Sequence, residues 1–332
     1  MLFLTEADVT GLLDMGEAIA ALEAGLAEEA GGGAQNMVKT HVLWDGGHTL
    51  HAIGAVFPRR GFACTKTWAH TGGANPHLLL FDAHDGQARA IMEAFALGQL
   101  RTGGISGLAT RWLALPQADE MGLIGSGPQA LTQLAAVAAV RRLKRVRVYS
   151  PTPEHRAAFA GRAADALGLR VEPVASVEAA VKDAPIVTLV TRARTPILHG
   201  AMLARGTHVN AVGAISPERA EFAADLLPRS ATIACDNVAT VRALSRELID
   251  AFGADETHWA RLAPLSAIIA AGAGRKPGAD LTLFKAMGMG ISDLSLAVEI
   301  YRRAQAQSVG RDMPATTRAR PRLKSAAAAP GG

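Results

Sequence analysis

Hydrophobic and polar positions follow two different patterns along this chain, and the pattern changes near residue 115. From about residue 119 onward, short apolar runs alternate with longer segments in which apolar residues recur at helical spacing. Such an alternation predicts strands joined by helices of about 10–15 residues, as in a parallel sheet that is covered on both faces. The expected strands lie within residues 121–125, 145–150, 169–174, 185–190, 207–213 and 231–236.

The first 115 residues predict a mixed α+β domain instead, because one long amphipathic segment precedes several strands. Residues 5–30 predict a single amphipathic helix that opens with a capping box of Thr5 and Asp8. The strands that follow are separated by turn sequences rich in glycine, proline and aspartate. We expect these strands within residues 38–44, 49–57, 62–68 and 77–93, and a second helix over 96–115.

These patterns predict two domains, which is the natural division of a chain of 332 residues. Residues 116–294 are expected to form an α/β domain of the Rossmann type, a doubly wound parallel sheet. Residues 1–115 form the α+β domain, and a helix near 295–315 is expected to pack back and complete it. Residues 316–332 are rich in alanine, proline and arginine and are expected to be a disordered tail.

Composition limits the class of protein. Hydrophobic residues make up 49% and charged residues 19%, which fits a soluble enzyme with a large core. No apolar run reaches the ~18–20 residues of a membrane helix, and acidic Glu6 and Asp8 argue against a secretory signal. Two cysteines, Cys64 and Cys235, are too few for a disulfide framework or a four-ligand zinc site. We therefore expect a cytoplasmic protein without a metal or membrane partner.

The net charge of +4 is located in the tail. From Arg311 onward, five basic residues and one acid, Asp312, account for the whole excess, so the rest of the chain is neutral. A short basic tail is more often a solvated segment than a nucleic-acid arm. We expect no nucleic-acid partner.

A glycine-rich segment carries the clearest motif. Gly125, Gly127 and Ala130 give the pattern G-x-G-x-x-A between a predicted strand and a predicted helix. The first glycine permits a tight turn, the second lets the backbone approach a pyrophosphate, and the small third residue allows close packing. The alternative is an ordinary strand–helix turn. We predict a dinucleotide site that includes the intervening Pro128 and Gln129.

The end of the second strand indicates the type of cofactor. An acidic residue there would bind a ribose hydroxyl and repel a 2′-phosphate. The segment 149–156 instead offers Ser150, Thr152 and Arg156, which suit a phosphate, and so favours NADPH over NADH. Glu154 lies nearby, and Arg156 is alternatively a surface residue of the next helix.

Three cations stand out in the first domain, namely Lys39, Lys66 and Arg101. A guanidinium next to small residues suits a carboxylate, which it grips with two parallel hydrogen bonds. The alternative for each cation is a structural salt bridge. Trp68 and His70 flank Lys66 and line a substrate ring in one interpretation, or form part of a half-buried core in the other.

Four blocks in this order resemble the ornithine cyclodeaminase/mu-crystallin family, and the resemblance covers about residues 1–310. The blocks are residues 100–110, 122–130, 209–222 and 281–294. The resemblance implies a discontinuous substrate and dimerisation domain beside the Rossmann domain, a homodimer, and a nicotinamide cofactor. Family activities include ornithine cyclodeaminase, alanine dehydrogenase and reductases of cyclic ketimines.

The resemblance also implies residue roles. Arg101 matches the ligand of the substrate carboxylate and Lys66 matches the lysine of the substrate domain, so both are predicted catalytic residues. Lys39 stands where an arginine is common, which implies a weaker contact. The last block resembles a stretch that closes over the nicotinamide, with Lys285 and Asp293 as its polar members, although Asp293 alternatively caps the next helix. Further cofactor contacts are predicted at Thr191, Val212 and Gly213.

The chain departs from the family at Ile215, which occupies the place of the catalytic aspartate of cyclodeaminases. Cyclodeamination needs repeated proton transfers by a positioned acid or base, and isoleucine provides neither. Glu218 and Glu221 lie in the same block as possible substitutes. Reduction of a ketimine requires fewer proton transfers from the protein, because the imine arrives protonated and the cofactor supplies the chemistry.

The sequence therefore predicts an NADPH-dependent reductase of a ketimine carboxylate, such as pyrroline-2-carboxylate or piperideine-2-carboxylate. Lys39, Lys66 and Arg101 are expected to bind the carboxylate, with Trp68 and His70 at the ring. The alternatives are an ornithine cyclodeaminase or alanine-type dehydrogenase, and a non-catalytic NADP(H)-binding protein like mu-crystallin. Ring size and direction of the reaction are left open.

Overall fold

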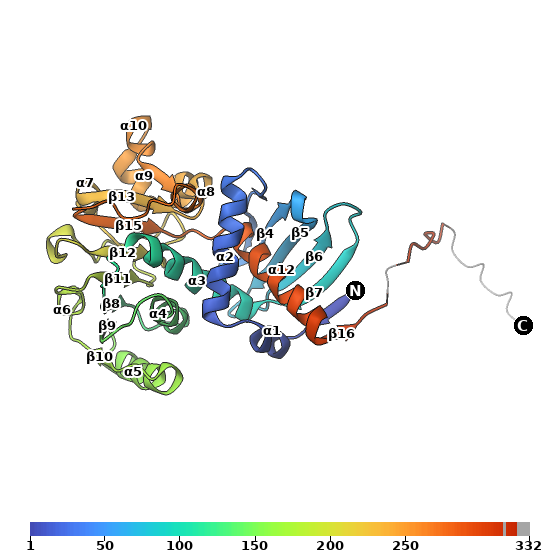
Figure 1. Ribbon diagram of the computed structural model, residues 1–332, viewed down its shortest axis with the longest axis horizontal. Coiled ribbons are helices and arrows are strands. Elements are labelled where there is room, and N and C mark those ends of the chain that lie inside the picture. Colours follow the sequence, from blue (N-terminus) through green and yellow to red (C-terminus); the bar gives the residue numbers. More distant parts are fainter. Residues whose placement is uncertain (315–316, 324–332) are drawn as a thin grey trace, which may run out of the picture.

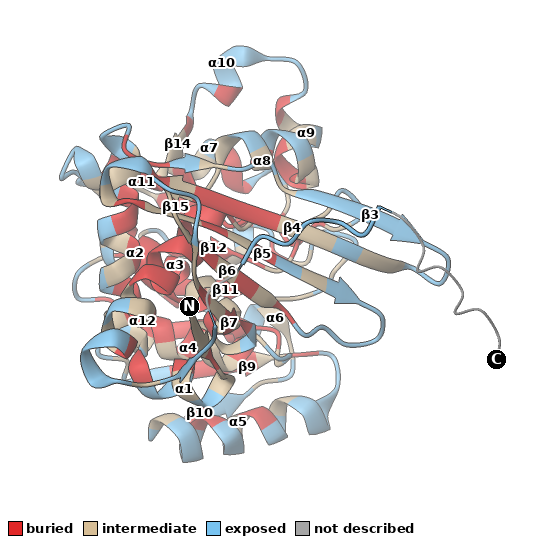
Figure 2. Cartoon of the chain, turned by 90° about the vertical axis from the view of Figure 1, so that its right-hand side faces the viewer, coloured by how far each residue is buried: buried red, intermediate tan, exposed pale blue. Residues whose placement is uncertain are grey.

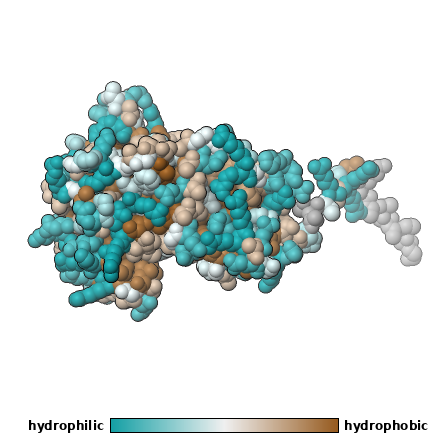
Figure 3. All heavy atoms as spheres, viewed as in Figure 1, coloured by the Kyte–Doolittle hydropathy of each residue, from teal (hydrophilic) through white to brown (hydrophobic). Residues whose placement is uncertain are grey.

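The computed structural model describes residues 1–314 and 317–323, which form two lobes, each built on its own sheet (Figure 1). The predicted tail falls partly outside this range, at 316 and 324–332. Residues 317–323 are exposed and contain no helix or strand. None of the described helices is long and apolar enough to cross a membrane. Hydrophilic residues cover most of the face drawn in Figure 3.

The first lobe contains a mixed sheet that is mainly antiparallel, in the order β16-β1-β7-β6-β5-β4-β2, with β3 paired to β4. Its strands are β1 Leu2–Leu4, β2 Gln35–Asn36, β3 Thr40–Trp44, β4 His48–Phe57, β5 Phe62–His70, β6 His77–Asp82, β7 Ala88–Glu93 and β16 Arg311–Asp312. Its helices are α1 Glu6–Leu12, α2 Met15–Ala30, α3 Phe95–Leu113 and α12 Gly290–Gln307, with a 3-10 turn η1 at Pro58–Arg60. The helix α12 packs on β4, β5 and α2 (Figure 1).

The predicted single helix over residues 5–30 is wrong, because the structure contains two helices there. The helix α1 ends at Leu12, and α2 begins after Asp14. The Asp14 carboxylate accepts a hydrogen bond from the backbone N–H of Glu17, and the Glu17 carboxylate accepts one from the N–H of Asp14. This second capping box starts a new helix within a continuous amphipathic pattern.

The second lobe is a fully parallel sheet in the order β10-β9-β8-β11-β12-β15-β13-β14. Its strands are β8 Glu120–Ile124, β9 Arg145–Tyr149, β10 Val171–Pro173, β11 Ile186–Leu189, β12 His208–Ala211, β13 Ser230–Cys235, β14 Leu262–Pro264 and β15 Leu281–Lys285. Its helices are α4 Ala130–Ala138, α5 Pro153–Leu167, α6 Val177–Val181, α7 Leu226–Arg229, α8 Val238–Leu244, α9 Arg246–Phe252, α10 Glu256–Trp259 and α11 Leu265–Ala270, with a 3-10 turn η2 at Gly200–Met202.

The strand order confirms the predicted doubly wound α/β fold. From β8 the chain first builds toward β9 and β10, and then resumes on the other side of β8 with β11 and β12. The strands β8 and β11 therefore flank the point where the order reverses. In such sheets, ligands bind in the crevice outside the carboxyl ends of the strands at this point.

The glycines that follow Arg101, Gly103, Gly104 and Gly107, allow close helix packing rather than access to the Arg101 guanidinium. A Cβ at Gly103 or Gly107 would lie within 2.7 Å of a backbone carbonyl of α4, and a Cβ at Gly104 would lie 2.7 Å from Leu22 of α2. These residues let α3 pack closely between α2 and α4, across the junction of the two lobes. They do not make room around the Arg101 guanidinium.

A buried histidine makes stability depend on pH. The ring of His208 lies 3.0 Å from Thr282 Oγ1 and 3.1 Å from Asn210 Oδ1. Burial lowers the pKa of His208 from 6.5 to about 3. The folded chain therefore binds this proton less tightly than the unfolded chain, so the stabilisation is present above pH 6.5 and is lost as the pH falls toward 3.

We expect His208→Gln, which can keep both polar contacts, to weaken this dependence. Between pH 6.5 and pH 5, the free energy of unfolding should fall by about 1.5 kcal/mol more in the native chain than in the variant. Urea unfolding at the two pH values measures the difference. Equal losses in the two proteins would show that another group governs acid sensitivity.

Candidate active site

The glycine-rich turn after β8 has the geometry of a phosphate cradle. Gly125 has a φ of +117°, and a Cβ there would lie 2.5 Å from the Val190 carbonyl oxygen, so only glycine fits. A Cβ at Gly127 would have no atom within 4 Å, so backbone lies open to a ligand there. The helix α4 begins at Ala130, after Pro128 and Gln129 in the turn. These features fit the pyrophosphate of a dinucleotide at a helix N-terminus.

The other side of the crevice is fixed by Glu221. Its buried carboxylate accepts hydrogen bonds from the N–H groups of Thr191, at 2.6 Å, Gly213, at 2.7 Å, and Ala214, at 3.0 Å. The structure thus joins the segments after β11 and β12, where Thr191, Val212 and Gly213 were predicted to contact the cofactor. A Cβ at Gly213 would lie 2.2 Å from the Thr191 carbonyl oxygen, so this close approach requires glycine.

Lys285 belongs to the same buried network as Glu221, and its side chain does not reach the surface. It is fully buried, and its ammonium donates to the Ala214 carbonyl oxygen at 2.6 Å and to Glu247 Oε1 at 3.1 Å. That the stretch around Lys285 closes over the nicotinamide stays a prediction, but the Lys285 side chain itself is directed into the protein. Its charge lowers the pKa of Glu221, against the larger effect of burial, which raises it.

Polar and basic groups gather at the carboxyl end of β9. Ser126 Oγ donates to Ser150 Oγ at 2.9 Å, and the Arg156 guanidinium donates to the Ser150 carbonyl oxygen at 2.7 Å. Thr152 is the N-cap residue of α5. Arg162, six residues further along α5, reaches the Ser126 carbonyl oxygen at 3.5 Å. Sequence reasoning missed Ser126 and Arg162, because only the fold brings α5 against the glycine turn.

Two of the three predicted substrate cations, Lys66 and Arg101, meet at one buried carboxylate. Lys66 on β5 forms an ion pair with Asp293 on α12, and both side chains are buried. Arg101 on α3 places its Nε 3.5 Å from the same oxygen, Asp293 Oδ1. Within the described chain, Asp293 Oδ2 and Arg101 Nε have no hydrogen-bond partner. Burial lowers the pKa of Lys66, and the charge of Arg101 lowers it further, while Asp293 raises it.

Asp293 does not cap the helix, so that alternative is wrong. The helix α12 begins at Gly290 with Met289 as its N-cap residue, which places Asp293 within the first turn. Its carboxylate is directed at Lys66 and Arg101. Its predicted contact with the cofactor stays a prediction.

The Arg101 guanidinium lies against the backbone of Gly288, in the segment between β15 and α12. Gly288 has a φ of +83°, and a Cβ there would lie 3.0 Å from Arg101 Nη1. The Asp236 carboxylate accepts from the N–H groups of Met287, at 3.0 Å, and Gly288, at 2.6 Å, and so fixes this segment. Lys39 is half-buried nearby, and burial, followed by the charge of Arg101, lowers its pKa.

The outer wall of the site is aromatic. The Lys66 ammonium lies 5.4 Å from the centre of the Trp68 ring, and Trp68 stacks on His51 at 4.8 Å. His51 in turn stacks on His41 at 5.6 Å. Trp68 is half-buried, and His70 is exposed further along β5. Sequence reasoning missed His41 and His51, because they lie beside Trp68 only when β3, β4 and β5 are in register.

Neither Glu218 nor Glu221 takes the place of an aspartate at Ile215. Ile215 follows β12 and is 39% exposed. Glu221 is buried and already accepts four hydrogen bonds. Glu218 is exposed, and a hydrogen bond with Ser216 leads the causes that lower its pKa, so it stays ionised at neutral pH. The two substitutes considered from the sequence are thus unsuited to donate a proton here.

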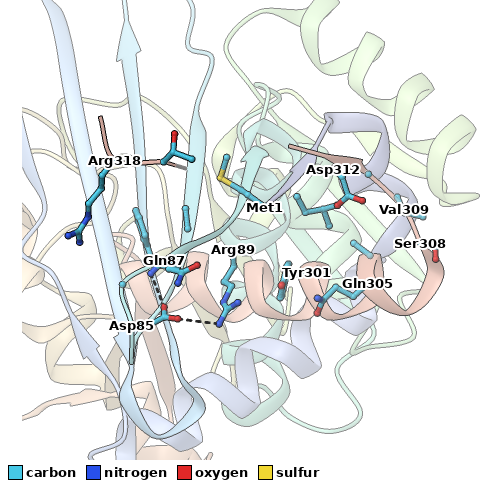
Figure 4. A pocket seen from close by; sticks show the side chains of 17 residues that line it. Met1, Asp85, Gln87, Arg89, Tyr301, Gln305, Ser308, Val309, Asp312 and Arg318 are labelled. Carbon is cyan, nitrogen blue, oxygen red and sulfur yellow. Dashed lines mark hydrogen bonds and ion pairs between the residues drawn. The ribbon is translucent and has the colours of Figure 1, made fainter. Parts of the chain in front are cut away.

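A separate cavity lies away from this site. It has a volume of about 960 Å³ and lies at the far end of the first lobe, between the β6–β7 turn and the end of α12 (Figure 4). Arg89 beside it is paired with Asp82 and Asp85. Across the described residues, no cluster of histidine, cysteine or acidic side chains could hold a metal ion.

Comparison with known proteins gives consistent matches. Residues 1–308 match the ornithine cyclodeaminase/mu-crystallin family. A Delta(1)-pyrroline-2-carboxylate reductase of Bacillus cereus is 32% identical over 244 residues, which is 71% of this chain and 73% of the relative. An iminosuccinate reductase of Paracoccus denitrificans is 28% identical over 236 residues, 71% of this chain and 72% of the relative.

A solved structure is also similar over nearly the whole fold. It is the Delta(1)-pyrroline-2-carboxylate reductase of Thermococcus litoralis in complex with NADH and L-proline. The TM-score is 0.88 at 28% identity, and the match covers 94% of this chain and 100% of that one.

Proposed function

The chain belongs to the ornithine cyclodeaminase/mu-crystallin family, and from this premise we propose that it is an oxidoreductase that reduces the C=N bond of a ketimine carboxylate with NADPH. Pyrroline-2-carboxylate and piperideine-2-carboxylate are the proposed substrates. The observation that carries the proposal is the meeting of Lys66 and Arg101 at Asp293, beside a dinucleotide crevice that has no acid at Ile215. Oxidation of NADPH by these imines tests it.

The site residues would act mainly by binding and orientation. When bound, the reduced nicotinamide supplies a hydride to the imine carbon. Arg101 and Lys66 would hold the substrate carboxylate, with Lys39 at its edge. Asp293 keeps both cations in place, and its charge raises the pKa of Lys66 against the larger lowering effect of burial. Trp68 and His70 would line the ring, and Ile215 supplies no acid or base for the ammonia loss of a cyclodeaminase.

The proposed preference for NADPH rests on the end of β9. Ser126, Ser150 and Thr152 offer hydroxyl groups there, and Arg156 and Arg162 lie beside them. A 2′-phosphate would meet donors and positive charge at this place, with no strand-terminal acid to repel it. NADH lacks this phosphate, so neither arginine would strengthen its binding.

We expect Arg156→Ala and Arg162→Ala together to raise the KM for NADPH about tenfold and to change the KM for NADH less than twofold, since a charge-assisted contact is worth ~1–2 kcal/mol. Arg170→Ala is the matched control, because Arg170 precedes β10 at the amino ends of the parallel strands, whereas the site lies at their carboxyl ends. Steady-state kinetics with both cofactors measure the ratio. An equal rise for both cofactors would remove the arginines from the choice between them.

We also propose that the chain forms a homodimer through the outer hairpin of the first lobe. Val42 and Trp44 of β3 and Leu50 of β4 are exposed apolar side chains on this hairpin, which Figure 2 shows extending from the body. Exposed apolar side chains that gather on one element are typical of a surface covered by a partner.

A further inference from the structure

Three charged side chains are buried together at the carboxyl ends of β12 and β15. Glu221 and Lys285 are 0% exposed, and Glu247 is 6% exposed. Glu247 Oε1 accepts hydrogen bonds from the backbone N–H of Glu221 and from the Lys285 ammonium, each at 3.1 Å. Lys285 ends β15 and lies in register with Ala211, which ends β12. Glu221, Glu247 and Lys285 thus form one connected group, the buried triad.

The hydrogen bonds indicate the charge of each member of the triad. Glu221 accepts two hydrogen bonds on each carboxylate oxygen. Glu247 Oε2 accepts from the Ser245 hydroxyl at 3.0 Å, so both of its oxygens also face donors. An ionised carboxylate accepts at both oxygens, whereas a carboxylic acid needs an acceptor for its own proton. Two carboxylates and the Lys285 ammonium together leave a net charge of −1 in the triad.

The triad also orients the backbone of one wall of the crevice. The Glu221 carboxylate accepts from three backbone N–H groups, those of Thr191, Gly213 and Ala214. The N–H and C=O groups of a planar trans peptide point in opposite directions. The carbonyl oxygens of Val212 and Gly213, which share peptide units with two of these N–H groups, therefore point away from Glu221. The far side of this wall thus presents the negative ends of peptide dipoles.

The nicotinamide half of a dinucleotide would lie against this wall. The glycine-rich cradle for the pyrophosphate follows β8, and the polar groups proposed for the adenosine ribose follow β9. The strands β11 and β12 lie on the other side of β8 from β9. A dinucleotide crosses the crevice at the point where the strand order reverses, so its second half would extend over the ends of β11 and β12.

We propose that the buried triad stabilises the oxidised, positively charged nicotinamide and thereby favours hydride donation to the imine. The inference rests on the proposed function and deepens its cofactor site. The imine carbon receives the hydride with its electron pair, the protonated imine nitrogen becomes a neutral amine, and the ring of the cofactor gains the positive charge. Negative charge and dipoles fixed where positive charge develops lower the free energy of that step. Glu247 and Lys285 act through the backbone and through charge, as positioning residues.

Burial makes the charge of the triad effective. The side chains of Lys285 and Glu247 are 0% and 1% exposed, so no water lies between them and the wall to screen their charges. Arg192 and Arg194, in the loop after β11, are exposed, and water and salt screen these two cations much more strongly. The net field at the wall is therefore expected to follow the sign of the triad.

The first test compares the dissociation constants of NADP+ and NADPH, measured by isothermal titration calorimetry. Glu247→Gln removes one negative charge, and the amide oxygen can keep the hydrogen bonds from Glu221 and Lys285. We expect the ratio of the Kd of NADP+ to the Kd of NADPH to rise about fivefold or more, the order expected for one charge across a partly buried site.

Glu256→Gln is the matched control, because Glu256 pairs with Arg242 at the surface and is 72% exposed. Its ratio should equal that of the native chain. An unchanged ratio in Glu247→Gln, or an equal rise in the control, would overturn the inference. Failure of the native chain to bind either form of the cofactor would instead overturn the proposed function.

The second test separates charge from shape. The double variant Glu247→Gln and Lys285→Met removes the ion pair but keeps the net charge of −1, which then resides on Glu221. Replacement of a buried ion pair by neutral side chains of similar volume is often tolerated. We expect the ratio of the two dissociation constants to return to within twofold of the native value. A ratio that stays as high as in Glu247→Gln, or rises further, would show that the triad acts only by shape and would contradict the proposal.

Discussion

Replacing Arg101 with alanine is expected to lower kcat/KM for the imine by about 10²-fold or more, chiefly through a higher KM. The loss corresponds to one charge-assisted clamp, ~3 kcal/mol, on the substrate carboxylate. Lys66 would remain, so binding should weaken without being abolished. Arg101→Lys should recover only part of the loss, because an ammonium cannot make two parallel hydrogen bonds.

Arg111 offers a matched control on the same helix. Its guanidinium pairs with Glu23 at the surface, 2.7 Å away and distant from the site. Arg111→Ala should leave the steady-state kinetics unchanged. Arg101→Ala with native kinetics would remove Arg101 from the site.

Replacing Asp293 with asparagine is expected to have the largest effect on stability, a loss of about 3 kcal/mol in the free energy of unfolding. The change removes the counter-charge of two cations, and an uncompensated buried charge is costly. Lys66 also loses the partner that raises its pKa, so a larger fraction of it should be neutral near pH 7. Activity should then fall more steeply as the pH rises.

Urea unfolding and the pH profile of kcat/KM measure these two effects. Asp119→Asn is the control, because Asp119 pairs with Lys144 at the exposed surface, where such pairs contribute little. A stable Asp293→Asn variant with a native pH profile would show that Asp293 does not position the cations.

The cofactor half of the site was predictable because its signal is local. Gly125 and Gly127 lie in the short turn between β8 and α4, and Ala130 begins α4, so the three residues form one short motif in the sequence. The same applies to the strands of the parallel sheet, whose apolar runs are short and separated by helical segments. The strands β14 and β15 were not identified as separate elements from the sequence.

The substrate half was predictable only in part. Lys66 and Arg101 were selected as uncompensated cations, whereas the structure supplies their carboxylate from Asp293, 227 residues beyond Lys66. No pattern in one sequence reveals a pair at that separation. The stack of His41 and His51 on Trp68 was missed for a related reason, since it exists only when β3, β4 and β5 are in register.

NADPH oxidation followed at 340 nm, with pyrroline-2-carboxylate and piperideine-2-carboxylate and with NADH in parallel, tests the central claim most directly. The account predicts turnover with these imines and a preference for NADPH. Tight NADPH binding without turnover of any imine, or release of ammonia from ornithine with NAD, would contradict it.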